Sequence, residues 1–239
     1  MSHPPILLFD FDGVIITQKA LEFTALRLIK NKFYKWKNIK NMRLIDFARL
    51  FEESDSKNRL KALIRVYKVY KKYIPSRWKR ILFFLKFRRM YPKYEKYEIL
   101  KPNLENILFK LRQSNFPLGI VSNTSGKRLN SYRTKLGLDQ YFSVFISRDN
   151  TPQRKPSPIP LLLALKHIKR DFNIQINKKD VYFVGDLPAD VQSANNAGIK
   201  SIALLSGHGK KNDLEKTNPT FLIENIEDIL EIEPLKKFL

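Results

Sequence analysis

The chain has 239 residues and carries 45 Lys and Arg against 23 Asp and Glu, a formal net charge of +22. This length suits one α/β domain with an appended module, and an apolar fraction of 43% excludes a disordered polyelectrolyte. The absence of Cys excludes disulfides and thiolate chemistry, and three His leave little material for a zinc site. The positive charge predicts an anionic partner.

No apolar run approaches the roughly 20 residues of a membrane span. Residues 1–5 lack the basic region of a signal peptide, and the apolar stretch behind them runs into acids. We therefore expect a cytoplasmic protein without a membrane partner. The sequence leaves open whether it is a monomer or a homodimer.

The first predicted element is a buried strand at residues 6–11, whose end carries Asp10 and Asp12. Two carboxylates separated by one residue, directly after an apolar run, are costly unless they meet a cation or a proton acceptor. Gly13 allows the chain to turn sharply away from the sheet.

Residues 17–98 differ in composition from both flanks. They hold 24 Lys and Arg against 7 Asp and Glu, 16 of the 29 aromatic residues and no Gly. Apolar residues recur at helical spacing, as at Leu60, Leu63 and Ile64, and Pro75 and Pro92 indicate helix boundaries. This segment, the insert, is therefore predicted to be all-helical.

Apolar strands alternate with helical patterns in the rest of the chain. Further strands are predicted at 118–122, 144–147, 181–185, 201–205 and 220–223, with helices at about 103–114, 126–136, 157–170, 189–197 and 225–231. Continuous apolar strands separated by amphipathic helices indicate a doubly wound, Rossmann-like α/β domain. The predicted domains are this core, residues 1–16 and 99–239, and the helical insert, residues 17–98. Ligands of such sheets bind beyond the carboxyl ends of the strands.

Polar residues follow the predicted strands. Ser122, Asn123 and Thr124 end the second strand, Lys155 precedes a helix that starts at a proline, and Asp186 and Asp190 follow a later strand. Carboxylates with an anionic substrate fit Mg²⁺. A lysine and hydroxyl groups can neutralise phosphoryl oxygens, and one aspartate can act as a nucleophile that forms an acyl phosphate.

Four motifs appear in order: DFDGV at 10–14, SNTS at 122–125, the lysine of RKPSP at 155, and GDLPAD at 185–190. Together they resemble the haloacid dehalogenase-like (HAD) hydrolase superfamily, nearest its phosphoglycolate phosphatase-like branch. The resemblance covers the core, and the insert lies where the family places its helical cap. Family members are expected to be Mg²⁺-dependent and to use an aspartate nucleophile.

The resemblance implies a role for each matching residue. Asp10 attacks phosphorus, whereas Asp12 protonates the leaving oxygen, later activates water and helps to hold Mg²⁺ through its backbone carbonyl. Ser122 binds a phosphoryl oxygen, with the Asn123 backbone contributing. Lys155 balances the charge of Asp10 and the phosphoryl group.

The same resemblance places Asp186 in the metal shell and has Asp190 orient that shell. The implied metal ligands are thus Asp10, Asp12, Asp186 and Asp190. An acid at position 12 is the phosphatase arrangement, which dehalogenases lack. We therefore expect a phosphomonoester hydrolase acting on a small phosphorylated metabolite through a phospho-aspartyl intermediate.

Two alternatives remain open at this stage. A phosphomutase of the same family would return the phosphoryl group to a sugar instead of to water. The basic, aromatic insert could also bind nucleic acid, making the chain a binding module or a polynucleotide-end phosphatase.

Overall fold

The computed structural model describes residues 3–17, 19–30, 71 and 73–239. The chain divides into two compact units, Met1–Thr17 with Ile99–Leu239, and Gln18–Glu98. The first contains the predicted core, and Thr17, which the sequence places in the insert, groups with it. Among the described helices, none combines the length and the apolar character that crossing a bilayer would require.

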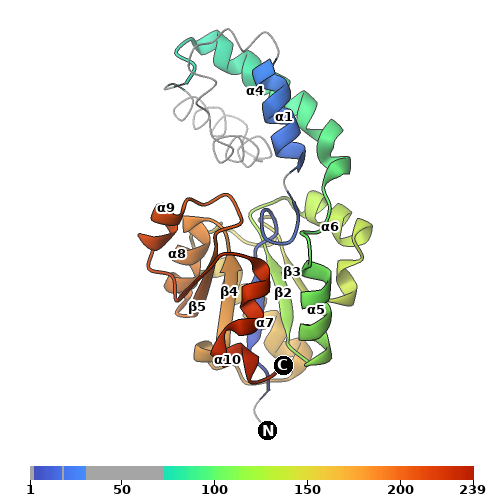
Figure 1. Cartoon of the computed structure of the whole chain (residues 1–239), viewed down its shortest axis with the longest axis vertical. Coiled ribbons are helices and arrows are strands. Elements are labelled where there is room, and N and C mark those ends of the chain that lie inside the picture. The colour runs from blue at the N-terminus through green and yellow to red at the C-terminus, as the bar shows by residue number, and fades with distance from the viewer. Residues whose placement is uncertain (1–2, 18, 31–70, 72) are drawn as a thin grey trace. The chain divides into compact units, whose positions relative to one another are not determined.

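A six-stranded parallel sheet forms the centre of the first unit (Figure 1). Its strands are β1 (Ile6–Phe9), β2 (Leu118–Val121), β3 (Val144–Ile146), β4 (Val181–Gly185), β5 (Lys200–Leu204) and β6 (Phe221–Ile223). They lie in the order β3-β2-β1-β4-β5-β6, and every neighbouring pair is parallel. The strand order reverses between β1 and β4, which is where doubly wound sheets bind ligands.

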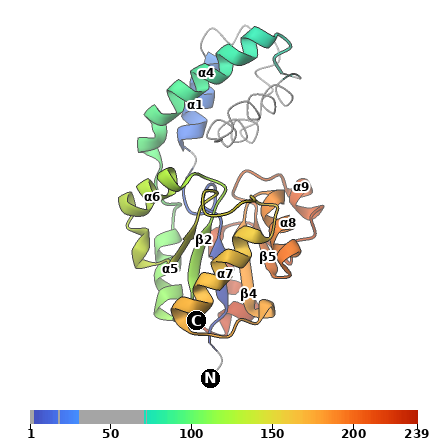
Figure 2. The ribbon, with the colours of Figure 1, turned by 180° about the vertical axis from the view of Figure 1, so that it is seen from behind.

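Helices cover both faces of this sheet (Figures 1 and 2). They are α5 (Leu104–Gln113), α6 (Gly126–Lys135), α7 (Ile159–Phe172), α8 (Pro188–Ala197), α9 (Lys211–Glu215) and α10 (Glu233–Lys236), with short 3₁₀ turns at Leu138–Gln140, Lys178–Asp180 and Ile226–Glu231. Side chains of β1 alternate between the two layers: Leu7 and Phe9 pack in a cluster with α5, α6 and α10, whereas Ile6 and Leu8 pack with α7 and α8. The strands are thus buried on both faces.

All six predicted strands are present, displaced by at most two residues at an end. The predicted helices of the core are also found, although residues 226–231 form a 3₁₀ helix. Pro92 was wrongly expected to mark a boundary, because it lies inside α4 (Arg77–Tyr94), two residues before its end. Leu60, Leu63 and Ile64 lie outside the described residues.

The described part of the second unit contains α1 (Lys19–Lys30), α4 and a 3₁₀ turn at Glu95–Tyr97. One face of α4 is buried through Phe83, Phe84 and Phe87. Glu98, which is buried, accepts hydrogen bonds from the backbone N–H groups of Lys19 (3.1 Å) and Ala20 (2.9 Å). This carboxylate satisfies free donors at the first turn of α1, where a negative charge is favourable.

In the first unit, the segments before and after the insert pair with each other. Thr17 N–H donates to the carbonyl of Ile99 (2.9 Å), and Ile99 N–H donates to the Thr17 hydroxyl (3.3 Å). Ile16 and Leu100 form an antiparallel bridge beside them. The segment that leads into the insert and the segment that leaves it are therefore hydrogen-bonded to each other.

Candidate active site

The site is built where β1 and β4, adjacent in the sheet, end. Asp10 follows β1, and its backbone N–H donates to the carbonyl of Val184 in β4 (2.8 Å). Asp186 directly follows β4, and Asp190 lies on the first turn of α8. All three side chains are buried. Parallel strands therefore bring acids that are 176 and 180 positions apart in the sequence to one edge of the sheet.

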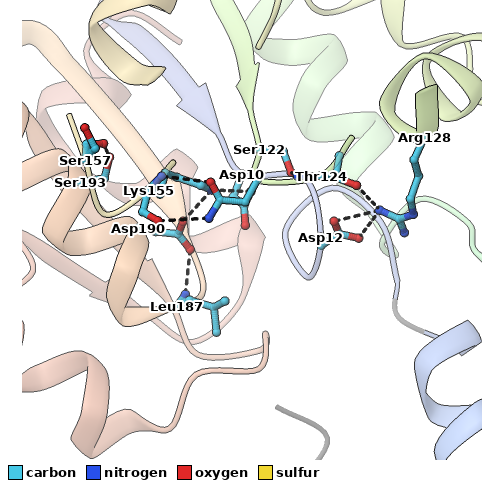
Figure 3. Close-up of polar contacts among 11 residues, drawn as sticks. Asp10, Asp12, Ser122, Thr124, Arg128, Lys155, Ser157, Leu187, Asp190 and Ser193 are labelled. Atoms are coloured by element: carbon cyan, nitrogen blue, oxygen red, sulfur yellow. Dashed lines mark hydrogen bonds and ion pairs between the residues drawn. The ribbon is translucent and has the colours of Figure 1, made fainter. Parts of the chain in front are cut away.

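Lys155 joins two of these acids (Figure 3). Its Nζ lies 2.7 Å from Asp10 Oδ1 and 2.7 Å from Asp190 Oδ1. The second oxygen of Asp190 accepts the backbone N–H of Leu187 (3.0 Å), which fixes the carboxylate at the start of α8. Lys155 is itself buried, so both ion pairs are shielded from water and are held in one geometry.

Asp186 sits in a close-fitting cradle of backbone. Its Oδ2 accepts the N–H of His208 (2.8 Å), and its carbonyl accepts the N–H of Gly209 (2.9 Å). A β-carbon at Gly13, whose φ is +83°, or at Gly207 would overlap the Asp186 side chain. Its Oδ1 has no hydrogen-bond partner in the described part of the chain. A buried carboxylate oxygen without a partner is costly unless a cation meets it.

The buried site contains more acids than cations. Burial raises the pKa of Asp10 well above its ordinary value, Lys155 opposes that rise, and Asp190 and Asp186 add to it. Burial also raises the pKa of Asp186 to about 7, with a further contribution from Asp190. Burial by itself would lower the pKa of Lys155, but Asp10 and Asp190 together raise it above its usual value. Lys155 thus stays protonated among three carboxyl groups.

These residues fit a divalent cation. One carboxylate oxygen from each of Asp10, Asp186 and Asp190 lies within 4.8 Å of the others. Mg²⁺ prefers oxygen ligands of this kind, its charge would offset the excess of carboxylates, and Asp186 Oδ1 offers an oxygen without a partner. The structure brings together three of the four acids predicted to hold metal.

Asp12, the fourth predicted acid, is expected to help to hold Mg²⁺ through its backbone carbonyl, and its carboxylate pairs with Arg128 instead of joining the other three. Nη1 of Arg128 in α6 lies 2.8 and 2.9 Å from its two oxygens. Figure 3 shows this pair apart from the group formed by Asp10, Lys155 and Asp190. The side chain of Asp12 is 25% exposed, so water reaches it more readily than the three buried acids.

Ser122 and Asn123 lie at the end of β2, beside the site. The Ser122 hydroxyl is buried and accepts the N–H of Thr124 (3.1 Å). The Asn123 side chain contacts the backbone of Lys155, accepting its N–H (3.0 Å) and donating to its carbonyl (3.3 Å). The amide of Asn123 therefore positions the segment that carries Lys155.

Sequence reasoning missed Arg128 and the backbone contribution of His208. Arg128 stands in a helix with three other basic residues, so nothing in its local pattern separates it from surface charge. The position of Arg128 in the first turn of the helix that follows SNTS was a signal that could have placed it near the site. His208 contributes through its backbone N–H, which any non-proline residue could provide.

The fold and this site define a class of protein: a doubly wound α/β protein with a buried acid–lysine cluster at its topological switch point. The family model for haloacid dehalogenase-like hydrolases matches residues 7–204. The chain belongs to that family. The predicted resemblance is thereby confirmed, and so is the predicted fold class.

Curated relatives are phosphoglycolate phosphatases. The enzyme from Vibrio parahaemolyticus is 28% identical over 134 residues, which cover 56% of this chain and 56% of that protein. The enzyme from Escherichia coli K12 is 29% identical over 148 residues, which cover 60% of this chain and 56% of the relative. The chain thus spans about half the length of the curated relatives that it matches.

Solved structures share the fold over nearly the whole chain. A predicted phosphoglycolate phosphatase from Haemophilus somnus superimposes with a TM-score of 0.64 at 21% identity, covering 98% of this chain and 99% of that one. A HAD-superfamily hydrolase of subfamily IA from Geobacter sulfurreducens gives a TM-score of 0.60 at 20% identity, covering 96% of both chains. At these identities the similarity concerns the fold.

Proposed function

We propose that this chain is a Mg²⁺-dependent phosphomonoester hydrolase acting on a small phosphorylated metabolite, with Asp10 as the nucleophile. The observation that carries the proposal is the ion pair between Asp10 and Lys155, buried at the sheet edge beside Asp186 and Asp190. A lysine placed there holds one oxygen of Asp10 and one of Asp190 and offers its remaining N–H group to a phosphoryl oxygen.

In the first step, an oxygen of Asp10 attacks phosphorus and the bond from phosphorus to the ester oxygen breaks. The leaving oxygen takes a proton from the carboxyl group of Asp12, which becomes a carboxylate. Lys155 and the hydroxyl of Ser122 stabilise charge on the phosphoryl oxygens. The product of this step is an acyl phosphate on Asp10.

In the second step, water attacks the phosphorus of this acyl phosphate. The Asp12 carboxylate takes a proton from the water, the bond between phosphorus and the Asp10 oxygen breaks, and inorganic phosphate leaves. Asp10 is regenerated as a carboxylate and Asp12 as an acid, so one water is consumed in each turnover.

Asp10, Asp186 and Asp190 would hold Mg²⁺ together with the backbone carbonyl of Asp12, with Asp190 able to act through water. The ion would supply positive charge that offsets the charges of the nucleophile and the phosphoryl group. Removal of divalent cations with EDTA should therefore abolish turnover, and added Mg²⁺ should restore it.

The nucleophile is tested with Asp10→Asn. Because the amide cannot form the acyl phosphate, turnover of para-nitrophenyl phosphate should fall by roughly three orders of magnitude or more. Asp213→Asn, which removes an exposed acid of α9, is the matched control and should keep wild-type activity. Near-normal turnover by the Asp10 variant would refute the assignment.

The substrate and the two alternatives are tested by one screen. Phosphoglycolate, sugar phosphates, nucleoside monophosphates and 5′-phosphorylated oligonucleotides are compared with and without Mg²⁺. Release of inorganic phosphate from a small metabolite is expected. An isomeric sugar phosphate as the product would indicate a phosphomutase, and a strong preference for oligonucleotides would indicate a polynucleotide-end phosphatase.

A further inference from the structure

Arg128 is a buried cation that the mechanism above does not use. It lies on the first turn of α6 and is 8% exposed. Its guanidinium carbon lies 5.0 Å from the centre of the Tyr132 ring and 5.7 Å from that of Phe11. Packed against this pair of contacting rings, the planar guanidinium has little freedom to move.

The same guanidinium is also held by polar contacts. Its Nη1 donates to Thr124 Oγ1 (3.2 Å) and to both oxygens of Asp12 (2.8 and 2.9 Å). These contacts connect three separate pieces of the chain: the loop after β1, the loop after β2 and helix α6. The direction of the Asp12 carboxylate is therefore set by a group that is itself fixed from several sides (Figure 3).

Burying a guanidinium costs several kcal/mol unless it is well paired. An exposed ion pair between α6 and the loop after β1 would hold the two together at a lower free-energy cost, because exposed charges are not desolvated. Asp12 is partly exposed, so without Arg128 its carboxylate could turn into water. The buried arginine therefore restricts Asp12 to one orientation.

We propose that Arg128 is a positioning residue for Asp12, setting the direction from which Asp12 delivers its proton to the leaving oxygen. This inference rests on the proposed function. As the phosphorus–oxygen bond breaks, the leaving oxygen takes the proton of Asp12, and the existing contact with Arg128 becomes an ion pair with the carboxylate that remains. When that carboxylate takes a proton from the attacking water, the pairing relaxes.

Leaving-group dependence tests the proposal. Phenyl phosphate has a poor leaving group that needs protonation, whereas 2,4-dinitrophenyl phosphate has a good one that does not. For Arg128→Met, kcat/KM for phenyl phosphate should fall by about 10–100-fold, with less than about threefold change for 2,4-dinitrophenyl phosphate. The parameter kcat/KM reports phosphoryl transfer to Asp10 and not the later hydrolysis. Arg128→Lys should recover part of the loss.

Two further variants keep the test decisive. Thr124→Val removes the hydroxyl that contacts Arg128, and kcat/KM should again fall more for phenyl phosphate than for 2,4-dinitrophenyl phosphate, by a smaller factor. This variant keeps the test available if Arg128→Met does not fold. Asp12→Asn gives the loss of kcat/KM for phenyl phosphate that is expected when the proton donor itself is removed. Adding Arg128→Met to Asp12→Asn should cause little further loss. An equal loss with both substrates, no loss, or a gain with phenyl phosphate would overturn the positioning role.

Failure of this inference is distinguishable from failure of the proposed function. If Asp10→Asn remains active, the proposed function itself is wrong. If Asp10→Asn is inactive and Asp12→Asn is selective for the good leaving group, but the Arg128 and Thr124 variants are not, then only the role of Arg128 is wrong.

Discussion

At the scale of single residues, Asp186 carries a strong electrostatic constraint. Its side chain is completely buried, and one of its oxygens lacks a hydrogen-bond partner among the described residues. Burial raises its pKa to about 7, and Asp190 adds to the rise. Without metal, the carboxyl group therefore holds its proton over a pH range in which an exposed aspartate would be ionised.

This raised pKa predicts how stability depends on pH. The folded-state pKa lies above the ordinary value of 3.8, so this carboxyl group binds more protons in the folded chain than in the unfolded chain between about pH 4 and 7. The contribution is fully present below the unfolded pKa and is lost as the pH rises through the folded one. In EDTA, the free energy of unfolding of the wild type should fall over this window, measured by urea denaturation.

Two comparisons isolate the source of that change. Asp186→Asn cannot ionise, so its free energy of unfolding should fall less over the same window. Saturating Mg²⁺ should stabilise the wild type most at the upper end of the window, because metal binds the ionised form. An identical pH dependence in both proteins without metal would contradict the assignment.

At the scale of secondary-structure elements, the loop after β5 shapes the site through its backbone. Residues 206–209 pass over Asp186, and the N–H groups of His208 and Gly209 donate to it. Gly207 has no room for a side chain, because a β-carbon there would overlap the Asp186 side chain. The loop thus holds Asp186 by close packing as well as by hydrogen bonds.

We expect Gly207→Ala to displace either the loop or Asp186. Such overpacking costs about 1–3 kcal/mol of stability, and displacement of Asp186, which is proposed to hold the metal, should weaken Mg²⁺ binding by about 10-fold or more. Calorimetric Mg²⁺ titration and thermal unfolding measure the two effects. Ser206→Ala, at the exposed neighbouring position, is the matched control and should change neither; unaltered Mg²⁺ affinity in Gly207→Ala would contradict the packing argument.

The elements of the core could be predicted because each strand is a short apolar run that ends in polar residues. That pattern also located Asp10 and Asp186, since polar groups at the carboxyl ends of parallel strands converge. Pro92 shows where local rules fail: a proline breaks a helix interior, yet near the end of α4 the helix continues for two residues.

Contacts between distant segments could not be predicted in the same way. Asp12 and Arg128 are 116 positions apart, and only the packing of α6 beside the loop after β1 brings them together. Likewise, the sequence suggested that Lys155 neutralises Asp10, but not that it also pairs with Asp190. Such pairings depend on tertiary geometry, which hydrophobic periodicity does not encode.

At the scale of the whole molecule, positive charge is concentrated in the insert. Helix α4 contains no acidic residue, and Arg77 and Arg89 on it are exposed. A strongly basic module raises the local concentration of small anions and their rate of association. The charge is therefore expected to assist the capture of an anionic phosphate ester.

Ionic strength tests this expectation. The kcat/KM for an anionic phosphate ester should fall as salt screens the field, and the variant Arg77→Glu/Arg89→Glu should lower it by about two- to fivefold at low salt. The variant Lys110→Glu/Lys169→Glu changes the net charge equally on exposed core helices and should have a smaller effect. Equal effects of the two variants would assign the attraction to net charge alone.

The paired segments at residues 16–17 and 99–100 have a consequence for how this protein could have evolved. Since Thr17 and Ile99 already hydrogen-bond to each other, a short turn could join them directly without distorting the sheet. Natural variation could then shorten, enlarge or replace everything between them while the α/β core kept its architecture. Changes in the insert would then leave the buried acids and Lys155 in place.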